Sequence, residues 1–308
     1  MMIQNALDSF ILDQRLKGST EKTVSGYEWF IGKFITWLAD FGVENANSLT
    51  VQHTQGYQLH LCSRQCENKN QPLTRRTVRT YMRHVRIFLS FCFAESIINE
   101  PIHIKMKLPK AEKPVIEILT DEESSHLLSR FGDDVLGCRD RAIICLMLDC
   151  GLRLSEVAGL RLSDINFDNR YIKVTGKGRK QRIVPIGQLA VQAVVKYNYR
   201  RNASGREQLF FSSRQSPLTP SGIGQLMKRL KAQTGILRLH AHLLRHTFAT
   251  NYLIYGIGDV YELSRILGHA DIKITEGYVQ LANYYKLLQN RNRQTYLDIK
   301  EARQVNEG

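Results

Sequence analysis

Long apolar runs are absent from this chain of 308 residues. The longest wholly apolar stretch runs from Ala142 to Leu148, far short of the roughly 20 residues that a membrane-spanning helix needs. The first residues show no basic segment followed by an apolar one, which a secretory signal would require. We therefore expect a cytoplasmic protein with no membrane among its partners.

Motifs for disulfides, metals and nucleotides are also lacking. The 6 cysteines form no C-x-x-C pair, and His60 and Cys62 do not have a recurrent zinc spacing, so reduced and largely buried thiols are expected. Lys177 lies between two glycines, but Tyr171 replaces the first glycine of a phosphate-binding Walker A loop. We expect no metal and no cofactor.

A zinc protease motif is incomplete as well. His242 and His246 lie one helical turn apart, as the zinc ligands of H-E-x-x-H do. Leu243 replaces the general-base glutamate of that motif, and Arg245 replaces that of the reversed motif H-x-x-E-H. A hydrolytic zinc site is therefore not expected.

Positive charge is in excess, with 43 Lys and Arg against 29 Asp and Glu and a formal net charge of +14. An excess of this size favours a polyanionic partner, either nucleic acid or an anionic surface. Charge alone does not choose between these two partners.

A strongly periodic helix is predicted from about Leu73 to Ile97. Its polar side carries five arginines that we call the arginine stripe: Arg75, Arg76, Arg79, Arg83 and Arg86. Such a stripe is commonly a solvated face, but no acidic residue between Arg75 and Arg86 offers an i,i+4 partner. We expect the stripe to bind the phosphate backbone of double-stranded DNA.

The chain is predicted to form two domains. Periodic apolar residues predict another helix from Thr20 to Gly42, so the first domain is helical. Between Asn99 and Glu117, prolines alternate with lysines, which is typical of an extended linker. We therefore assign residues 1–104 to the first domain, 105–118 to the linker and 119–308 to the second domain.

The second domain is predicted to be mainly α with a small β-sheet. Alternating residues predict strands over Tyr171–Thr175 and Gln181–Ile186, joined by a glycine-rich turn. A helix is predicted to end near Gly151. Further helices are predicted near residues 155–160, 188–201, 219–233, 242–255, 260–267 and 272–281, with a polar helical tail to the end of the chain.

Several cationic and hydrogen-bonding groups of this domain could carry chemistry, although each has an ordinary structural alternative. Arg153 could cap helical carbonyls, Lys177 could be a solvated turn residue, and Tyr278 could be a core aromatic. The segments around these groups, residues 151–156, 176–178, 242–250, 267–269 and 275–278, resemble the tyrosine recombinase (phage integrase) family in order and spacing. The resemblance covers residues 119–281 and implies a two-domain integrase or Xer-like member.

The resemblance implies a fold and a set of catalytic residues. The fold would be a helical, SAM-like core-binding domain followed by an α+β catalytic domain. The catalytic residues would be Arg153, Lys177, His242, Arg245, His269 and Tyr278. In these roles Tyr278 would be the nucleophile, His242 its base and Lys177 the general acid for the leaving 5′-oxygen, without metal or cofactor.

Family membership further implies site-specific DNA recombination through a 3′-phosphotyrosyl intermediate. The partners would be a specific double-stranded DNA site, a homo-tetramer with each tail docked in trans, and an accessory DNA-bending or directionality protein. The expected location is the cytoplasmic nucleoid. The tail beyond Tyr278 does not resemble that of Xer members, which favours integration, excision or resolution of a mobile element. The alternatives are Xer-type dimer resolution, a type IB topoisomerase and a non-catalytic DNA-binding relic.

Overall fold

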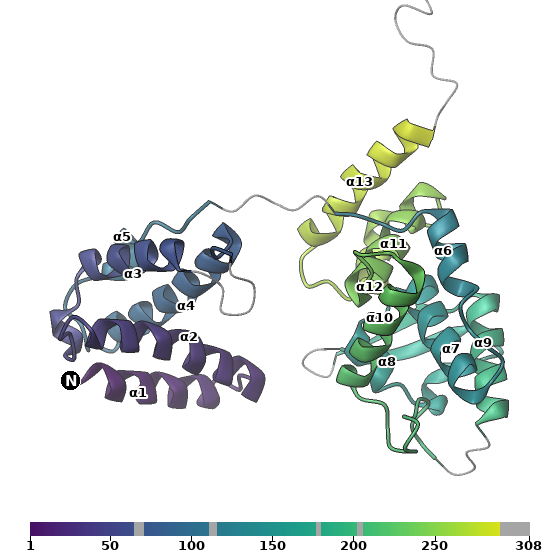
Figure 1. Cartoon of the computed structure of the whole chain (residues 1–308), viewed down its shortest axis with the longest axis horizontal. Helices are drawn as coiled ribbons and strands as arrows, with labels where there is room; N and C mark the ends of the chain where they lie inside the picture. The colour runs from purple at the N-terminus through teal and green to yellow at the C-terminus, as the bar shows by residue number, and fades with distance from the viewer. Residues whose placement is uncertain (65–70, 111–115, 177–179, 202–205, 290–308) are drawn as a thin grey trace, which may run out of the picture. The chain divides into compact units, whose positions relative to one another are not determined.

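The computed structural model describes residues 1–64, 71–110, 116–176, 180–201 and 206–289. The chain divides into two compact units, Met1–Pro114 and Val115–Gly308 (Figure 1). Each unit has its own hydrophobic core. The predicted fold class, mainly α with a small β-sheet, is confirmed by the arrangement of elements in the two units.

The first unit is built from helices. These are α1 (Ile3–Leu16), α2 (Glu21–Ala39), α3 (Val51–Ser63), α4 (Arg75–Ala94) and α5 (Ile102–Lys105), with a 3-10 turn, η1, over Ala46–Ser48. The side chains of Thr20 and Thr74 accept hydrogen bonds from backbone N–H groups at the starts of α2 and α4, which fixes where these helices begin. Phe10, Phe34 and Phe88 fill the core between α1, α2 and α4.

Helix α4 has the two faces that the sequence predicts. Its apolar face is buried, and all five residues of the arginine stripe are exposed. Helix α5 lies within the segment predicted to be extended, between Asn99 and Glu117. The physical reason is that Ile102 and Met106 are apolar and become buried in the core of the first unit.

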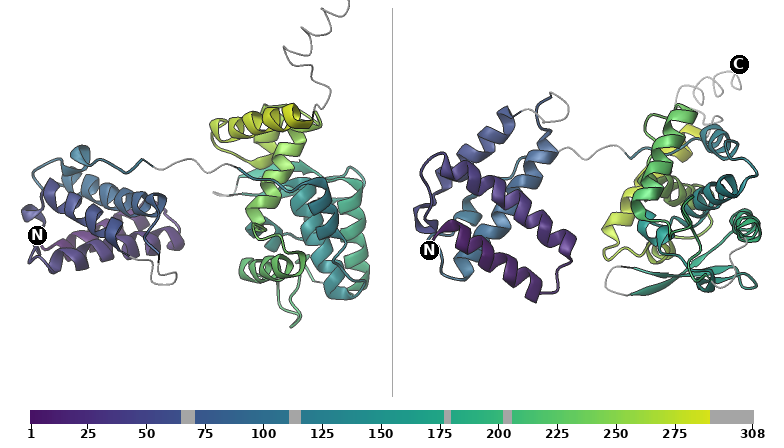
Figure 2. Two further views of the ribbon diagram at one scale, coloured as in Figure 1. Left: turned by 45° about the horizontal axis from the view of Figure 1, so that its top comes forward. Right: turned by 60° about the horizontal axis from the view of Figure 1, so that its bottom comes forward.

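The second unit combines helices with three antiparallel strands, which lie at one side of the unit (Figure 2). The helices are α6 (Asp121–Leu128), α7 (Val135–Cys150), α8 (Leu154–Ala158), α9 (Gln188–Arg200), α10 (Pro220–Thr234), α11 (Ala241–Ile254), α12 (Val260–Leu267) and α13 (Lys273–Gln289), and the 3-10 turn η2 covers Leu162–Asp164. Among the helices described, none combines the length and apolar character that crossing a membrane would require.

The sheet contains one strand more than predicted. Strand β2 (Tyr171–Thr175) pairs with β3 (Gln181–Pro185), with Lys173 opposite Ile183, as the predicted hairpin requires. The additional strand, β1 (Ile165–Asn166), pairs with the other edge of β2. Two residues are too few to show an alternating pattern, so β1 was not predicted.

Two glycines end helices close to the predicted site. Gly151 follows α7 with φ +59°, and Gly268 follows α12 with φ +63°, both in the left-handed region that favours glycine. Helix α11 packs against α7, α12 and α13 (Figure 1). The ends of α7 and α12 and the faces of α11 and α13 thus meet in one region. Helix α13 extends past Leu281 to Gln289, into the part of the chain that the sequence predicts as a polar helical tail.

Candidate active site

Arg245 lies at the centre of this region, on α11, with only 4% of its surface exposed. Its Nη1 donates to the carbonyl of Gly151 at 2.5 Å, and its Nη2 donates to the carbonyl of Leu267 at 2.6 Å. Both carbonyls lie at helix C-termini, where the partial negative charge favours a cation. Burial, followed by the neighbouring Arg153, lowers the pKa of Arg245 to about 10, so this side chain stays charged at neutral pH.

Gly151 is required at its position for a second reason. A Cβ atom there would lie 2.3 Å from Cδ1 of Phe248, which is also on α11. The absence of a side chain therefore lets the end of α7 approach α11 closely enough for Arg245 to reach the Gly151 carbonyl.

Arg153 follows this turn and precedes α8. Its backbone N–H and its Nη1 both donate to Glu156, at 2.8 and 3.0 Å, and its Nη2 lies 3.4 Å from the carbonyl of Gly268. The Arg153 side chain keeps 34% of its surface exposed. It is therefore the more accessible of the two predicted catalytic guanidinium groups.

His269 lies directly after Gly268 and contacts Arg245. Its Nε2 is 3.2 Å from Arg245 Nη2, and its Nδ1 is 2.9 Å from Thr275 Oγ1. Because a guanidinium can only donate, Nε2 accepts and Nδ1 carries the proton. Burial and the charges of Arg245 and Arg153 lower the pKa of His269 to about 4, which leaves the ring neutral. Nε2 would have to gain a proton before it could donate to a phosphate.

Tyr278 is buried on α13, with 4% of its surface exposed. Its ring lies nearly parallel to that of His269, with 6.4 Å between centroids and 14° between planes. Burial raises the pKa of the phenol, and the charges of Arg245 and Arg153 partly oppose that rise. The predicted nucleophile is thus close enough to the two predicted catalytic guanidinium groups for their charges to act on it.

The hydroxyl of Tyr278 lies 2.8 Å from Nδ1 of His246, a residue that sequence reasoning did not select. His242, the predicted base, is exposed one helical turn earlier, and its ring centroid is 6.3 Å from that of His246. Burial, followed by Arg245, lowers the pKa of His242. The i,i+4 spacing of the two histidines is visible in the sequence, but it does not say which ring meets the tyrosine.

Sequence reasoning also missed a buried ion pair beside Arg153. Both oxygens of Glu156 accept from Arg182 on β3, at 2.8 Å each, and Arg182 Nε donates to the carbonyl of Ile266 at 2.6 Å. The Glu156 side chain is 5% exposed and that of Arg182 is 11% exposed. Burial acts to raise the pKa of Glu156, but the hydrogen bonds from Arg182 and the Arg153 backbone outweigh it, so the pKa is lowered.

Lys177 lies outside the described residues. Its neighbours Gly176 and Lys180 close the end of the β2–β3 hairpin, where the Gly176 N–H donates to the Lys180 carbonyl at 2.8 Å. Arg182 on the same hairpin, opposite Val174, bonds to Glu156 and Ile266, so the hairpin is joined near its turn end to the region that contains Arg153.

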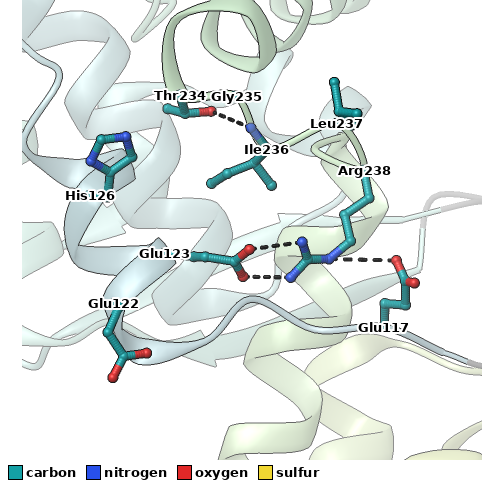
Figure 3. Close-up of a pocket in the computed structure, with 9 residues that line it drawn as sticks. All are labelled: Glu117, Glu122, Glu123, His126, Thr234, Gly235, Ile236, Leu237 and Arg238. Atoms are coloured by element: carbon teal, nitrogen blue, oxygen red, sulfur yellow. Dashed lines mark hydrogen bonds and ion pairs between the residues drawn. The ribbon is translucent and has the colours of Figure 1, made fainter.

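A separate hollow lies between α6 and the end of α10 (Figure 3). Its residues are Glu117, Glu122, Glu123, His126, Thr234, Gly235, Ile236, Leu237 and Arg238. The guanidinium of Arg238 is held by Glu123 and lies 3.5 Å from Glu117, as the dashed lines in Figure 3 show. Of the predicted catalytic residues that the structure describes, none lines this hollow, so it is separate from the candidate site.

The arginine stripe forms a second candidate surface, on the first unit. Within the described residues, Arg75, Arg76, Arg83 and Arg86 have no carboxylate partner, and Arg79 Nη1 donates to the carbonyl of Pro109 at 2.8 Å. The stripe therefore presents uncompensated positive charge on one exposed helix face.

The site of the second unit suits chemistry on an anion. It combines buried or half-buried guanidinium groups, neutral imidazoles and one buried tyrosine hydroxyl. Planar, multi-donor guanidinium groups bind phosphate oxygens well, and a tyrosine oxygen can act as a nucleophile.

Comparison with known proteins identifies a family model and curated relatives that match most of the chain. Residues 117–284 match the model of the phage integrase family. The chain is 31% identical over 278 residues to tyrosine recombinase XerC of Bacillus pumilus (strain SAFR-032), which covers 86% of this chain and 88% of that protein. It is 30% identical over 290 residues to tyrosine recombinase XerD of Halalkalibacterium halodurans, which covers 91% of this chain and 94% of that protein.

Solved structures show the same fold. The Tn1549 transposon integrase in complex with circular intermediate DNA has a TM-score of 0.71 and 20% identity, covering 98% of this chain and 99% of that one. A lambda integrase dimer bound to a core site has a TM-score of 0.70 and 17% identity, covering 96% of this chain and 99% of that one. Taken with the family match and the curated relatives, these similarities show that the chain belongs to the phage integrase family of tyrosine recombinases.

Proposed function

We propose that this protein is a site-specific DNA recombinase that cuts and rejoins strands through a 3′-phosphotyrosyl bond at Tyr278. The observation that carries the proposal is the burial of Tyr278 with its ring beside that of His269, whose Nε2 contacts Arg245. A tyrosine outside such a cluster would have no cation to offset the charge of an incoming phosphate.

Arg153 and Arg245 hold the nonbridging oxygens of the scissile phosphate in this proposal. Arg245 uses Nη1 and Nη2 to bind two carbonyls, and its five N–H groups leave donors for a phosphate. Their charges offset the charge that develops as the tyrosine oxygen attacks phosphorus. His269 supports the same phosphate, with Nε2 protonated once the phosphate replaces Arg245 as its partner.

The leaving 5′-oxygen needs a proton, which Lys177 supplies as general acid in the proposal. The phosphotyrosyl bond keeps the energy of the broken phosphodiester, so a 5′-hydroxyl from another strand can reverse the step. Exchange between two duplexes then takes four protomers, in a homo-tetramer whose tails dock in trans. An accessory DNA-bending or directionality protein would select the direction.

The first domain, assigned from the sequence to residues 1–104 with 105–118 as the linker, acts as the core-binding domain in this proposal. Its arginine stripe binds the phosphates of the target duplex, and residues 119–308 form the catalytic domain. The exposure of all five arginines supports this assignment. Phosphate contacts of this kind orient a protein on DNA and contribute salt-dependent affinity.

Two biological roles fit this activity. The tail beyond Tyr278 favours integration, excision or resolution of a mobile element. The Xer-type alternative, resolution of chromosome or plasmid dimers, is favoured by the XerC and XerD relatives, which match over most of the chain. The position of the target site distinguishes the roles, because a site at the ends of a surrounding element supports the first role and a chromosomal site outside any element supports the second.

The activity is tested by trapping the covalent intermediate. Wild-type protein, Tyr278→Phe and Tyr284→Phe are incubated in EDTA with supercoiled DNA that carries the flanks of the gene, and the reaction is stopped with detergent. Tyr284 is a matched control because it is an exposed tyrosine on the same helix. We expect protein attached to DNA 3′ ends with wild type and Tyr284→Phe, and none with Tyr278→Phe.

Sequencing the trapped ends then identifies the target site. Two results would overturn the proposal. The first is an adduct that persists in Tyr278→Phe. The second is wild-type protein that binds every flank tested without forming an adduct.

A further inference from the structure

The hydroxyl of Tyr278 lies 2.8 Å from Nδ1 of His246. Its partner is therefore His246 and not His242, the base that the sequence predicted. We propose that His246 is the catalytic residue that takes the proton from the Tyr278 hydroxyl during strand cleavage and returns it during rejoining. This inference rests on the proposed function, since it concerns the activation of the same nucleophile.

The direction of the hydrogen bond follows from burial. Tyr278 is 4% exposed, and within the described part of the chain His246 is the hydrogen-bond partner of its hydroxyl. If Nδ1 donated, the buried phenolic O–H would have no described acceptor, which is costly for a group removed from water. If Nδ1 accepts, the O–H is satisfied. The arrangement therefore favours the His246 tautomer that carries its proton on Nε2.

His242 is less well placed for the same task. It is exposed on α11, one turn before His246, and within the described residues no hydrogen bond joins it to Tyr278. A general base must come within hydrogen-bond reach of the proton that it abstracts, and His246 already does so.

The charged and titratable neighbours of His246 keep its ring neutral before DNA binds. Burial, then His242, His240 and Arg245, lower its pKa to about 4. A neutral ring has a lone pair on Nδ1 and can accept a proton. An incoming phosphodiester is an anion, and its charge favours the protonated form of a nearby imidazole.

The step balances as a single proton transfer coupled to substitution at phosphorus. The O–H bond of Tyr278 breaks and an N–H bond forms at Nδ1 of His246. The phenolate oxygen attacks phosphorus, and the bond from phosphorus to the 5′-oxygen breaks. The 5′-oxygen takes a proton from the general acid. In the reverse step the 5′-hydroxyl returns its proton to the general acid as its oxygen attacks phosphorus. The bond from phosphorus to the Tyr278 oxygen breaks, and His246 returns its proton to that oxygen.

The first test needs no DNA and does not depend on recombinase activity. Nitrogen-15 NMR of histidine-labelled full-length protein reports which ring nitrogen of His246 carries the proton, with His246→Asn used for assignment. We expect protonated Nε2 and unprotonated Nδ1, with a shift of the Nδ1 signal in Tyr278→Phe. A proton on Nδ1, or no response to Tyr278→Phe, would overturn the inference.

The second test uses the target site recovered from the trapped ends. Single-turnover adduct formation at saturating DNA is measured as a function of pH for wild type, His246→Asn, His246→Phe, His242→Gln and His240→Gln. The His240→Gln variant removes an exposed histidine at the start of the same helix and is the control for the maximal rate. Because His240 contributes to the lowered pKa of His246, this variant should shift the pH dependence of the rate but keep its maximum. Thermal unfolding and DNA affinity are measured for each variant, so that misfolded variants are recognised.

A side-chain amide can replace the hydrogen bond of Nδ1 but cannot take up the proton. We therefore expect both His246 variants to lose about 100-fold or more in the rate of adduct formation, the size typical of general-base catalysis. The loss in His242→Gln should be smaller. A wild-type rate in His246→Asn would show that the residue only positions Tyr278, and a larger loss in His242→Gln would restore His242 as the base. If wild type forms no adduct, the proposed function fails, whereas the NMR result still reports the contact.

Discussion

Arg182 and Glu156 are joined by two hydrogen bonds of 2.8 Å: Nη1 donates to Oε1, and Nη2 donates to Oε2. The pair connects β3 to α8, and Arg182 Nε extends the connection to the carbonyl of Ile266 on α12. Three elements that surround the candidate site are therefore held by one side chain. The planar guanidinium of arginine can donate two parallel hydrogen bonds to one carboxylate, which the ammonium of lysine cannot do.

Removal of Arg182 is expected to destabilise the second unit. In Arg182→Met the buried Glu156 carboxylate keeps Arg153 but loses its bidentate partner, and breaking a buried pair typically costs about 3 kcal/mol or more. Denaturant unfolding measures the change. We expect Arg182→Lys to recover only part of the loss, since an ammonium is a point charge with no fork.

The coupling between these two residues can be isolated by a double-mutant cycle. Glu156→Gln combined with Arg182→Met should cost less than the sum of the two single changes, because neither partner is then left charged and unpaired. Strict additivity would contradict the assignment of Arg182 and Glu156 as one interacting unit.

Gly151→Ala is expected to be more harmful than Gly235→Ala. Both glycines follow helices with positive φ, +59° and +70°, so both variants carry the cost of left-handed backbone, about 1–2 kcal/mol. Only at Gly151 does the new Cβ meet another atom, at 2.3 Å from Phe248, whereas nothing lies within 4 Å at Gly235.

Because Phe248 and Arg245 share α11, the Gly151 variant should also lose adduct formation, while the Gly235 variant should keep it. Urea unfolding and the covalent trapping assay measure the two effects. Equal stability losses at the two positions would argue against the close approach of α7 and α11.

The arginine stripe predicts a specific salt dependence of DNA binding. Changing Arg83 or Arg86 to Gln should weaken binding to all sequences alike and reduce the slope of log affinity against log salt by about 1 for each lost phosphate contact. Arg15 on α1 is also exposed and pairs with Glu21, so Arg15→Gln is the control and should leave the slope unchanged. Equal slopes in all variants would place the DNA contact elsewhere.

Stability is expected to fall on mild acidification. The pKa values of His246 and His269 are lowered to about 4, mainly by burial, whereas an unfolded histidine titrates near 6.5. Between these values the unfolded chain binds more protons, so the free energy of unfolding decreases as the pH falls from 6.5 towards 4.

The upper limit of this effect is about 1.4 kcal/mol per pH unit for each histidine, and partial exposure of the rings should reduce it. Denaturant unfolding at a series of pH values measures the slope. His246→Asn should show a shallower slope than wild type. A stability that is constant between pH 6.5 and 4.5 would contradict the neutral, half-buried state of these rings.

The sequence by itself determined the order and type of most elements and the family. Helix starts at Thr20, Thr74 and Thr120 and helix ends at Gly151 and Gly268 depend on local capping, which a few neighbouring residues decide. The same is true of the faces of α4, because side-chain direction along a helix follows from residue spacing. Strand β1 was not predicted because a segment of two residues is too short to show an alternating pattern.

Only the tertiary structure decided which residues of the site contact one another. Arg245 binds carbonyls 94 and 22 positions away, and Arg182 resembles any charged strand residue until its contact with Glu156 is known. His242 and His246 are both histidines on the same side of α11, so residue type and helix face do not distinguish them. The place where α13 crosses α11 selects His246 for contact with Tyr278. Such choices depend on the packing of distant helices, which spacing along one helix does not specify.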